Sequence, residues 1–343
     1  MNDQAVVGRL APSPTGALHL GNARSFLLAW LSARSQSGRV ILRIEDIDSP
    51  RVKPWAVQST IEDLAWLGLD WDDGPDLTDS QCRLTDSQCR DTTQYVQSNR
   101  MDRYRSIVEK LIEDDRCFPC TCSRNDIANA QSAPHESSEA TAPTKQIDGQ
   151  VYPGTCRKKQ LAREQLPEKH AWRWKFEPGS ITWTDALSGR QELEPSVMLG
   201  DFVIAKSNLA PSYQLAVVID DHDMGVTEII RGDDLIYSTF RQLSIQRHLS
   251  WQPPRYCHVP LIVGEDGRRL AKRHGDTRLS YFRDSGIRSQ AIVGYLAWTL
   301  GMLDQLEPCS PSDLIPLLNW QQIPRKPTVF SLQRDRAFLQ AIS

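Results

Sequence analysis

The sequence predicts an α/β protein built on a doubly wound parallel sheet, and two observations carry this prediction. Short apolar segments alternate with helical segments over about the first 70 residues, and strands that alternate with helices usually form a parallel sheet. A loop rich in proline and glycine, residues 12–21, follows the first apolar segment. Ligands of such sheets bind at the carboxyl ends of the strands, so we expect a binding site at this loop.

The N-terminal elements follow from apolar periodicity. Residues 6–11 form a short apolar strand, and a helical segment continues to about Ser35. Residues 39–46 form the second predicted strand, and residues 54–67 a helix with a proline near its start. One face of that helix carries the apolar residues Val57, Ile61, Leu64 and Ala65.

The residue pattern in the middle of the chain predicts a further helix, an insertion and several strands. Residues 101–113 have the spacing of an amphipathic helix. Residues 125–150 are poor in apolar side chains and predict a mobile insertion. Residues 172–176 alternate aromatic and basic side chains, and residues 215–219 and 226–230 are apolar runs. We expect all three segments to be strands.

The pattern is helical from Leu279 onward, and residues 291–303 are the longest apolar run. This run is shorter than the roughly 20 residues that span a membrane, so it predicts a buried helix. The sequence shows no signal peptide. We therefore expect a cytoplasmic protein without a membrane segment, and nothing in the sequence requires more than a monomer.

Composition narrows the function classes. With 343 residues, 40% hydrophobic and 24% charged, the chain fits a globular protein with one large domain and an appendage, or with two modest domains. A net charge of −3 does not by itself indicate a nucleic-acid-binding protein. Any phosphate-binding surface must be local, and the best candidate is the cluster Arg268, Arg269, Lys272, Arg273, His274 and Arg278. By itself, such a cluster is usually a solvated loop.

Two short motifs predict phosphate chemistry. His19, Gly21 and Asn22 stand where the loop opens into a helix, and backbone N–H groups at a helix start bind phosphate. An imidazole at this place can donate to phosphate oxygens as charge builds on them. Far downstream, Arg269 and Lys272 follow a glycine turn, and a lysine on a loop can stabilise a leaving pyrophosphate.

These motifs belong to a larger set that resembles the glutamyl-tRNA synthetases. Residues 9–24, RLAPSPTGALHLGNAR, resemble the HIGH-motif segment of that family, and residues 269–273, RLAKR, occupy the place of its KMSKS loop. Residues 42–48, LRIEDID, resemble its second-strand motif. Residues 213–221 and 227–235 resemble its substrate-pocket segments. The resemblance implies a class I synthetase with a Rossmann-like fold that activates glutamate with ATP and Mg²⁺.

The resemblance also implies a role for each matched position. It places the substrate L-glutamate among Arg9, Ala11, Ser13, Glu45, Tyr213 and Arg231. Glu45 is the expected partner of the ammonium, and two arginines suit the two carboxylates of glutamate; which arginine takes which carboxylate stays open. ATP binding is expected at His19, Gly21, Asn22 and Lys272, and His19, Gly21 and Lys272 are the expected catalytic residues. The loop departs from KMSKS, with Arg269 for the first lysine and Ala271 for the serine.

The part of the chain after Lys272 is too short for the anticodon-reading region of a full glutamyl-tRNA synthetase. In this respect the sequence resembles a shortened paralogous family, the glutamyl-queuosine tRNA(Asp) synthetases. The resemblance implies transfer of glutamate to queuosine, the modified wobble base of tRNA(Asp). Its partners would be L-glutamate and tRNA(Asp) carrying queuosine.

A cysteine cluster predicts one structural zinc ion. Eight cysteines without a secretory signal indicate reduced thiols. Cys120 and Cys122, followed by Tyr152 and Cys156, resemble the zinc site of the shortened family. Tyrosine is not a usual zinc ligand, so Cys117 and His135 are possible substitutes. The alternative is a set of structural thiols.

The expected organisation is a split catalytic domain, residues 1–100 and 200–280, with an inserted zinc-bearing acceptor-type subdomain, residues 101–199, and a short helical C-terminal region, residues 281–343. A heptad, LTDSQCR, occurs twice in tandem within residues 77–90 and predicts a surface loop. Three other functions remain open: a truncated enzyme that charges a tRNA 3′ end, another nucleotidyltransferase with a HIGH motif, or a non-catalytic tRNA-binding paralogue.

Overall fold

We describe the fold from a computed structural model of the chain, which describes residues 5–47, 52–75, 92–132, 151–159, 166–270 and 275–343. The strands are β1 (Val7–Leu10), β2 (Arg39–Leu42), β3 (Cys117–Cys120), β4 (Ala171–Trp174), β5 (Ile181–Asp185), β6 (Gly189–Leu193), β7 (Val203–Lys206), β8 (Glu228–Gly232), β9 (Arg255–Val259), β10 (Ile262–Val263) and β11 (Thr328–Val329). The α-helices are α1 (Leu20–Ser35), α2 (Pro54–Leu67), α3 (Met101–Glu113), α4 (Arg124–Ser132), α5 (Pro195–Met198), α6 (Tyr213–Asp223), α7 (Ile236–His248), α8 (Leu279–Asp284), α9 (Ser289–Thr299), α10 (Pro311–Leu314) and α11 (Leu332–Ala341).

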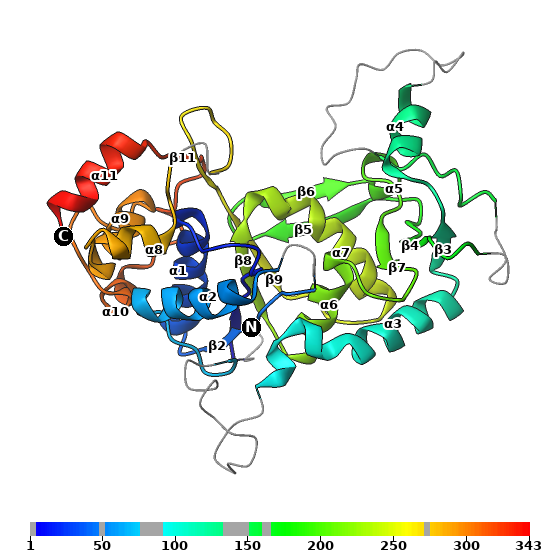
Figure 1. The fold of residues 1–343 in the computed structure, drawn as a ribbon, viewed down its shortest axis with the longest axis horizontal. Coiled ribbons are helices and arrows are strands. Elements are labelled where there is room, and N and C mark those ends of the chain that lie inside the picture. Colours follow the sequence, from blue (N-terminus) through cyan, green and yellow to red (C-terminus); the bar gives the residue numbers. More distant parts are fainter. Residues whose placement is uncertain (1–4, 48–51, 76–91, 133–150, 160–165, 271–274) are drawn as a thin grey trace, which may run out of the picture.

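Two parallel strand pairs form the centre of the molecule (Figure 1). β1 pairs with β2, and β8 pairs with β9. Thr227, just before β8, donates its backbone N–H to the carbonyl oxygen of Val7 at the start of β1, at 3.0 Å. β1 therefore lies between β2 and β8, and the carboxyl ends of β1 and β8 meet at one edge. The predicted parallel arrangement is confirmed for these strands.

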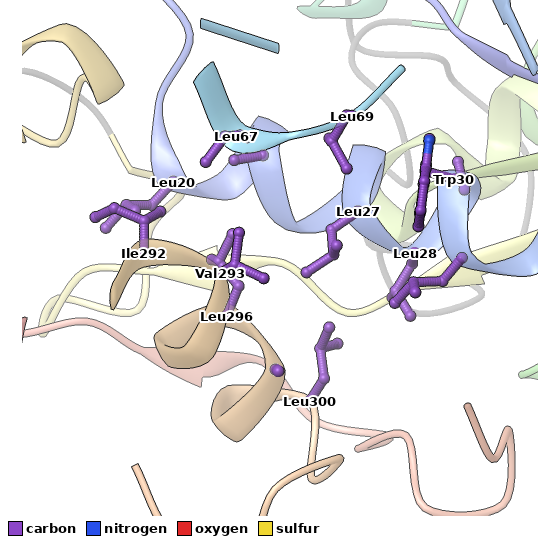
Figure 2. Packing of buried hydrophobic residues seen from close by; sticks show 14 of the residues in the cluster. Leu20, Leu27, Leu28, Trp30, Leu67, Leu69, Ile292, Val293, Leu296 and Leu300 are labelled. Carbon is purple, nitrogen blue, oxygen red and sulfur yellow. The ribbon is translucent and has the colours of Figure 1, made fainter. Parts of the chain in front are cut away.

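A helical layer covers one side of these strands and contains the larger buried cluster (Figure 1). Figure 2 shows Leu20 and Leu27 of α1 facing Val293 and Leu296 of α9. All four side chains are fully or almost fully buried, and each contributes about 1.5–3 kcal/mol by leaving water. The predicted buried helix within residues 291–303 is confirmed as α9. The C-terminal helices thus share a core with α1 and α2.

The second buried cluster lies at the other end of the molecule (Figure 1). The buried face of α3 carries Tyr104, Val108 and Leu111, as its periodicity predicted. Trp174 on β4 is fully buried in the same cluster. Trp174 thus packs in the core beneath its sheet.

Three predictions on secondary structure were wrong or incomplete. Residues 215–219 lie in the helix α6 and do not form a strand. All its residues from Leu215 to Asp221 are buried, so this helix has no polar face whose period could reveal it. The strand predicted at residues 39–46 is shorter, since β2 ends at Leu42.

The insertion predicted at residues 125–150 begins with a regular helix, α4. Its start has reciprocal caps: Ser123 Oγ accepts from Asp126 N at 3.2 Å, and a carboxylate oxygen of Asp126 accepts from Ser123 N at 2.7 Å. Residues 133–150 lie outside the described residues, as does the repeated heptad of residues 77–90. Throughout the described ranges, every helix is too short or too polar to cross a bilayer.

Candidate active site

A cavity of about 430 Å³ opens where β1 and β8 end and α1 begins. It brings together every predicted glutamate- and ATP-binding residue that the structure describes: Arg9, Ala11, Ser13, His19, Gly21, Asn22, Glu45, Tyr213 and Arg231. These residues come from β1, the loop before α1, the first turn of α1, the segment after β2, α6 and β8. Lys272, Arg273 and His274 lie outside the described residues.

His19 caps helix α1 at one wall of the cavity. Its Nδ1 accepts a hydrogen bond from the backbone N–H of Gly21 at 3.1 Å. A Cβ atom at Gly21 would lie 3.1 Å from this ring, tighter than an ordinary contact, so glycine permits the close approach. Burial, with the nearby charge of Arg269, lowers the pKa of His19 to about 4. His19 is therefore neutral near pH 7, and because Nδ1 is an acceptor, Nε2 carries the proton and can donate it.

Two arginines of the predicted basic cluster have carboxylate partners. Arg269 lines the cavity and donates to Asp234 at 2.8 Å. Arg278 donates through Nε to Asp276 at 2.8 Å. Both charges are exposed and partly neutralised, so these pairs add little stability. The two arginines remain near the α1 start, where an anion would be attracted.

A buried chain of charges lies behind Arg9 and Glu45. Arg43 donates to Asp221 at 2.7 Å and to Glu45 at 2.9 Å. Asp221 also pairs with Arg9 at 3.3 Å. Burial lowers the pKa of Arg43, but Asp221, Glu45 and Asp220 raise it well above its usual value. Arg43 is thus a fixed cation that holds Glu45 in place.

Burial raises the pKa of the Glu45 carboxyl, while Arg43 and Arg9 act in the opposite direction. A substrate ammonium beside Glu45 would favour the carboxylate further. Tyr213, at the first turn of α6, also has a raised pKa because of burial. It therefore remains a neutral phenol.

Arg231 has a different environment from Arg9. Its Nε donates to His258 Nε2 at 3.0 Å, and its Nη2 donates to Thr239 Oγ1 at 2.7 Å and to Gln242 Oε1 at 2.8 Å. These partners are neutral, and among the described residues no carboxylate forms an ion pair with Arg231. Its Nη1 is buried and has no hydrogen-bond partner in the described part of the chain. A buried cation with a free donor, at a cavity wall, is suited to a carboxylate ligand.

The prediction from sequence missed Arg43, Asp221, His258 and Asp185 as members of this site. The first two stand inside motifs that the sequence singled out, and one signal was available. Paired aspartates in an otherwise apolar segment, residues 215–221, require buried partners. His258 and Asp185 carry no such local signal.

A second site lies at β3 and the start of α4. The sulfur atoms of Cys120, Cys122 and Cys156 lie within 4.8 Å of one another, and Cys122 and Cys156 are 3.5 Å apart. The Tyr152 hydroxyl lies 3.5 Å from Cys120 Sγ and accepts from Cys156 N at 2.7 Å. The structure does not bring Cys117 to this group, since that thiol packs in the second buried cluster. His135 lies outside the described residues.

The thiols differ in acidity. Burial raises the pKa of Cys117 to about 12. Burial also raises the pKa of Cys156, but hydrogen bonds from Thr121, Cys122 and Tyr152 outweigh it and lower the value to about 7. Cys156 is therefore the thiol that most readily becomes a thiolate, the form that binds metals.

Comparison with known proteins agrees with the fold. Residues 5–332 match the family described as tRNA synthetases class I (E and Q), catalytic domain. A glutamate tRNA ligase from Elizabethkingia meningosepticum, solved with its amino acid, superposes with a TM-score of 0.76. At 24% identity, over 98% of this chain and 69% of that one, this likeness shows the fold. The fold and the site thus define a ligase of the class I aminoacyl-tRNA synthetase type.

The sequence comparisons narrow the class further. The glutamyl-Q tRNA(Asp) synthetase of Rhodopirellula baltica is 45% identical over 95% of this chain and 96% of its own length. That of Symbiobacterium thermophilum is 43% identical over 93% of this chain and 94% of its own length. A glutamate–tRNA ligase of Coxiella burnetii is 36% identical over 98% of this chain but only 66% of its own length. The chain belongs to the glutamyl-Q tRNA(Asp) synthetase family.

Proposed function

We propose that this enzyme uses ATP to convert L-glutamate into glutamyl-adenylate and transfers the glutamyl group to queuosine at the wobble position of tRNA(Asp). The observation that carries the first half is the charge pattern of the cavity. Arg9, Arg231 and Glu45 supply two cations and one anion, the complement of two carboxylates and one ammonium. Ala11, Ser13 and Tyr213 complete the glutamate-binding wall in this proposal.

Activation requires the α-carboxylate of glutamate to attack the α-phosphate of ATP while pyrophosphate leaves. His19 is placed to donate its Nε2–H to a phosphate oxygen, and the start of α1 favours negative charge. We assign Lys272, with Gly21 and Asn22, to the same ATP site. Mg²⁺ bound to the ATP phosphates would neutralise part of their charge.

Similarity to the two bacterial enzymes named above, over nearly their whole length, supports queuosine as the acceptor. The test is transfer of radiolabelled glutamate to purified tRNA(Asp) with and without queuosine, followed by mapping of the label. We expect label in the anticodon loop, only when queuosine is present. Label on the 3′-terminal adenosine would instead indicate an ordinary charging enzyme. Formation of the adenylate without transfer to tRNA(Asp) would point to another acceptor. Absence of both reactions would indicate a non-catalytic paralogue.

We further propose that Cys120, Cys122 and Cys156 hold one structural zinc ion, with Tyr152 as the fourth ligand. Sulfur atoms around a tetrahedral zinc lie about 3.8 Å apart, given a Zn–S distance of about 2.3 Å. Cys122 Sγ and Cys156 Sγ are 3.5 Å apart, close to this value, and all three sulfurs lie within 4.8 Å of one another. Bound zinc would crosslink β3 to the segment that carries Tyr152 and Cys156.

Freshly purified protein is expected to contain about one zinc ion per chain, and Cys120→Ser is expected to lose it, because a three-ligand site binds far more weakly. Inductively coupled plasma mass spectrometry measures the content. Cys309→Ser is the matched control, since that cysteine lies outside the cluster. Absence of zinc from the unaltered protein would refute the site. A zinc content in Tyr152→Phe equal to that of the unaltered protein would show only that Tyr152 is not a ligand.

We also propose that the chain consists of a split catalytic domain, residues 1–100 and 200–280, a zinc-bearing insertion, residues 101–199, and a helical C-terminal region, residues 281–343. We propose that the enzyme acts as a cytoplasmic monomer. Light scattering on the purified protein measures the mass in solution.

A further inference from the structure

Behind Arg231 lies a buried pair, Asp185 and His258. The proposed match between the charges of the cavity and those of glutamate does not involve this pair. His258 stands on β9 directly opposite Arg231 on β8. Asp185 ends β5, in the hairpin that β5 forms with β6. Both side chains are inaccessible to solvent. Neither residue lines the cavity, so any influence on a ligand must pass through Arg231.

The hydrogen bonds of Asp185 set the proton position on His258. One carboxylate oxygen, Oδ1, accepts from the backbone N–H groups of Leu187 and Ser188 at 3.0 and 2.7 Å. The other, Oδ2, accepts from His258 N at 2.9 Å and from His258 Nδ1 at 2.7 Å. Because Nδ1 carries the proton, His258 Nε2 has a free lone pair, and Arg231 Nε donates to it at 3.0 Å.

The charge state of His258 agrees with this arrangement of protons. Burial lowers the pKa of His258 to about 4, although Asp185 acts in the opposite direction. The imidazole is therefore neutral at working pH. A protonated ring, or the other tautomer, would turn an N–H toward the N–H of Arg231.

We propose that Asp185 and His258 are positioning residues that hold the Arg231 fork in the orientation that binds a substrate carboxylate, and so set the affinity for glutamate. This inference rests on the proposed glutamate-activating function. Asp185 imposes the tautomer, His258 accepts from Nε, and Thr239 with Gln242 holds Nη2. The fork is then fixed on one side, and Nη1 remains for the ligand.

Asp185→Asn tests the tautomer directly. With its oxygen kept as the acceptor for the backbone N–H groups of Leu187 and Ser188, the asparagine turns its NH₂ group toward His258, whose backbone N–H loses its acceptor and whose Nδ1 faces a donor. The ring must then carry its proton on Nε2, opposite the donor of Arg231. We expect the KM for glutamate to rise about 10- to 100-fold, the loss typical of one charge-assisted hydrogen bond. We expect kcat to change less than about threefold.

Two variants at position 258 distinguish the loss of the hydrogen-bond acceptor from a change in side-chain volume. His258→Phe keeps a ring and removes the acceptor, so it is expected to raise the KM for glutamate as much as Asp185→Asn does. His258→Gln offers an amide oxygen near the place of Nε2, so it is expected to recover most of the affinity. Glu192→Gln, an exposed position on the same hairpin, is the control and is expected to leave KM unchanged.

The measurement is glutamate-dependent ATP–pyrophosphate exchange, with KM and kcat determined separately for each protein. KM does not depend on the fraction of enzyme that is folded, so a merely structural role would lower kcat and leave KM as it is. Unchanged KM values in both Asp185→Asn and His258→Phe would overturn the inference while the unaltered enzyme still activates glutamate. Absence of exchange in the unaltered enzyme would instead defeat the proposed function, and this inference with it.

Discussion

Replacing Arg231 by alanine is expected to lower kcat/KM for glutamate activation by about 10²- to 10³-fold. Arg231 is 5% exposed and has only neutral hydrogen-bond partners among the described residues. Its positive charge is therefore available to the ligand. Without it, one carboxylate of glutamate must enter the cavity unpaired, and removal of one partner of a buried charge pair costs about 2–5 kcal/mol. Each 1.4 kcal/mol is a factor of ten.

ATP–pyrophosphate exchange at varied glutamate concentration measures this effect. Arg231→Lys keeps the positive charge but not the planar guanidinium fork, so its loss of kcat/KM is expected to be smaller than that of Arg231→Ala. Arg255→Ala is the matched control, because Arg255 lies on the adjacent strand β9, is half exposed and pairs with Glu228. A KM close to that of the unaltered enzyme in Arg231→Ala would remove Arg231 from the glutamate site.

Replacing Glu45 by glutamine is expected to have an effect of similar size, because the ammonium of glutamate loses its only proposed anionic partner. The same residue predicts a pH dependence. Only the carboxylate form of Glu45 binds an ammonium, and burial raises the pKa of this carboxyl. As the pH falls through that raised pKa, the carboxyl is protonated and glutamate binding weakens. The KM for glutamate should therefore rise at a higher pH than an ordinary glutamate, with a pKa of about 4.3, would predict.

The check is a profile of KM against pH for the unaltered enzyme, Glu45→Gln and Asp46→Asn. Asp46, the next residue, accepts from Ser98 and does not line the cavity, so its variant should keep the profile of the unaltered enzyme. Glu45→Gln should have a high KM for glutamate at every pH, and its KM should not show the rise at low pH that protonation of Glu45 causes. A normal KM in Glu45→Gln would exclude Glu45 as the partner of the ammonium.

Arg9 and Arg231, the two arginines proposed to bind glutamate, differ in a way that no local pattern of residues shows. Arg9 shares Asp221 with Arg43, so part of its charge is already neutralised. Arg231 is held by a histidine, a threonine and an amide. We therefore expect Arg231 to contribute more to the affinity for a carboxylate than Arg9 does. The comparison of Arg231→Ala with Arg9→Ala measures this order.

The prediction of secondary structure succeeded where local physics dominates. The bounds predicted for α2 and α3 agree with the structure, because a proline start or a strongly amphipathic face marks these helices. It failed at α6, where burial on all sides removes the amphipathic period. It was incomplete at α4, whose caps, Ser123 and Asp126, lie only three residues apart and were available in the sequence.

The sequence by itself determined the family, the parallel strand–helix pattern and nine of the residues that line the cavity, because these depend on short segments whose residues are neighbours in the chain. Only the tertiary structure decided which charges neutralise one another. Arg43 meets Asp221, and Asp185 meets His258, across long stretches of sequence. Such pairs form when packing excludes water and each buried polar group must find a partner. The same requirement left Arg231 with neutral partners, and no local pattern of residues could have shown it.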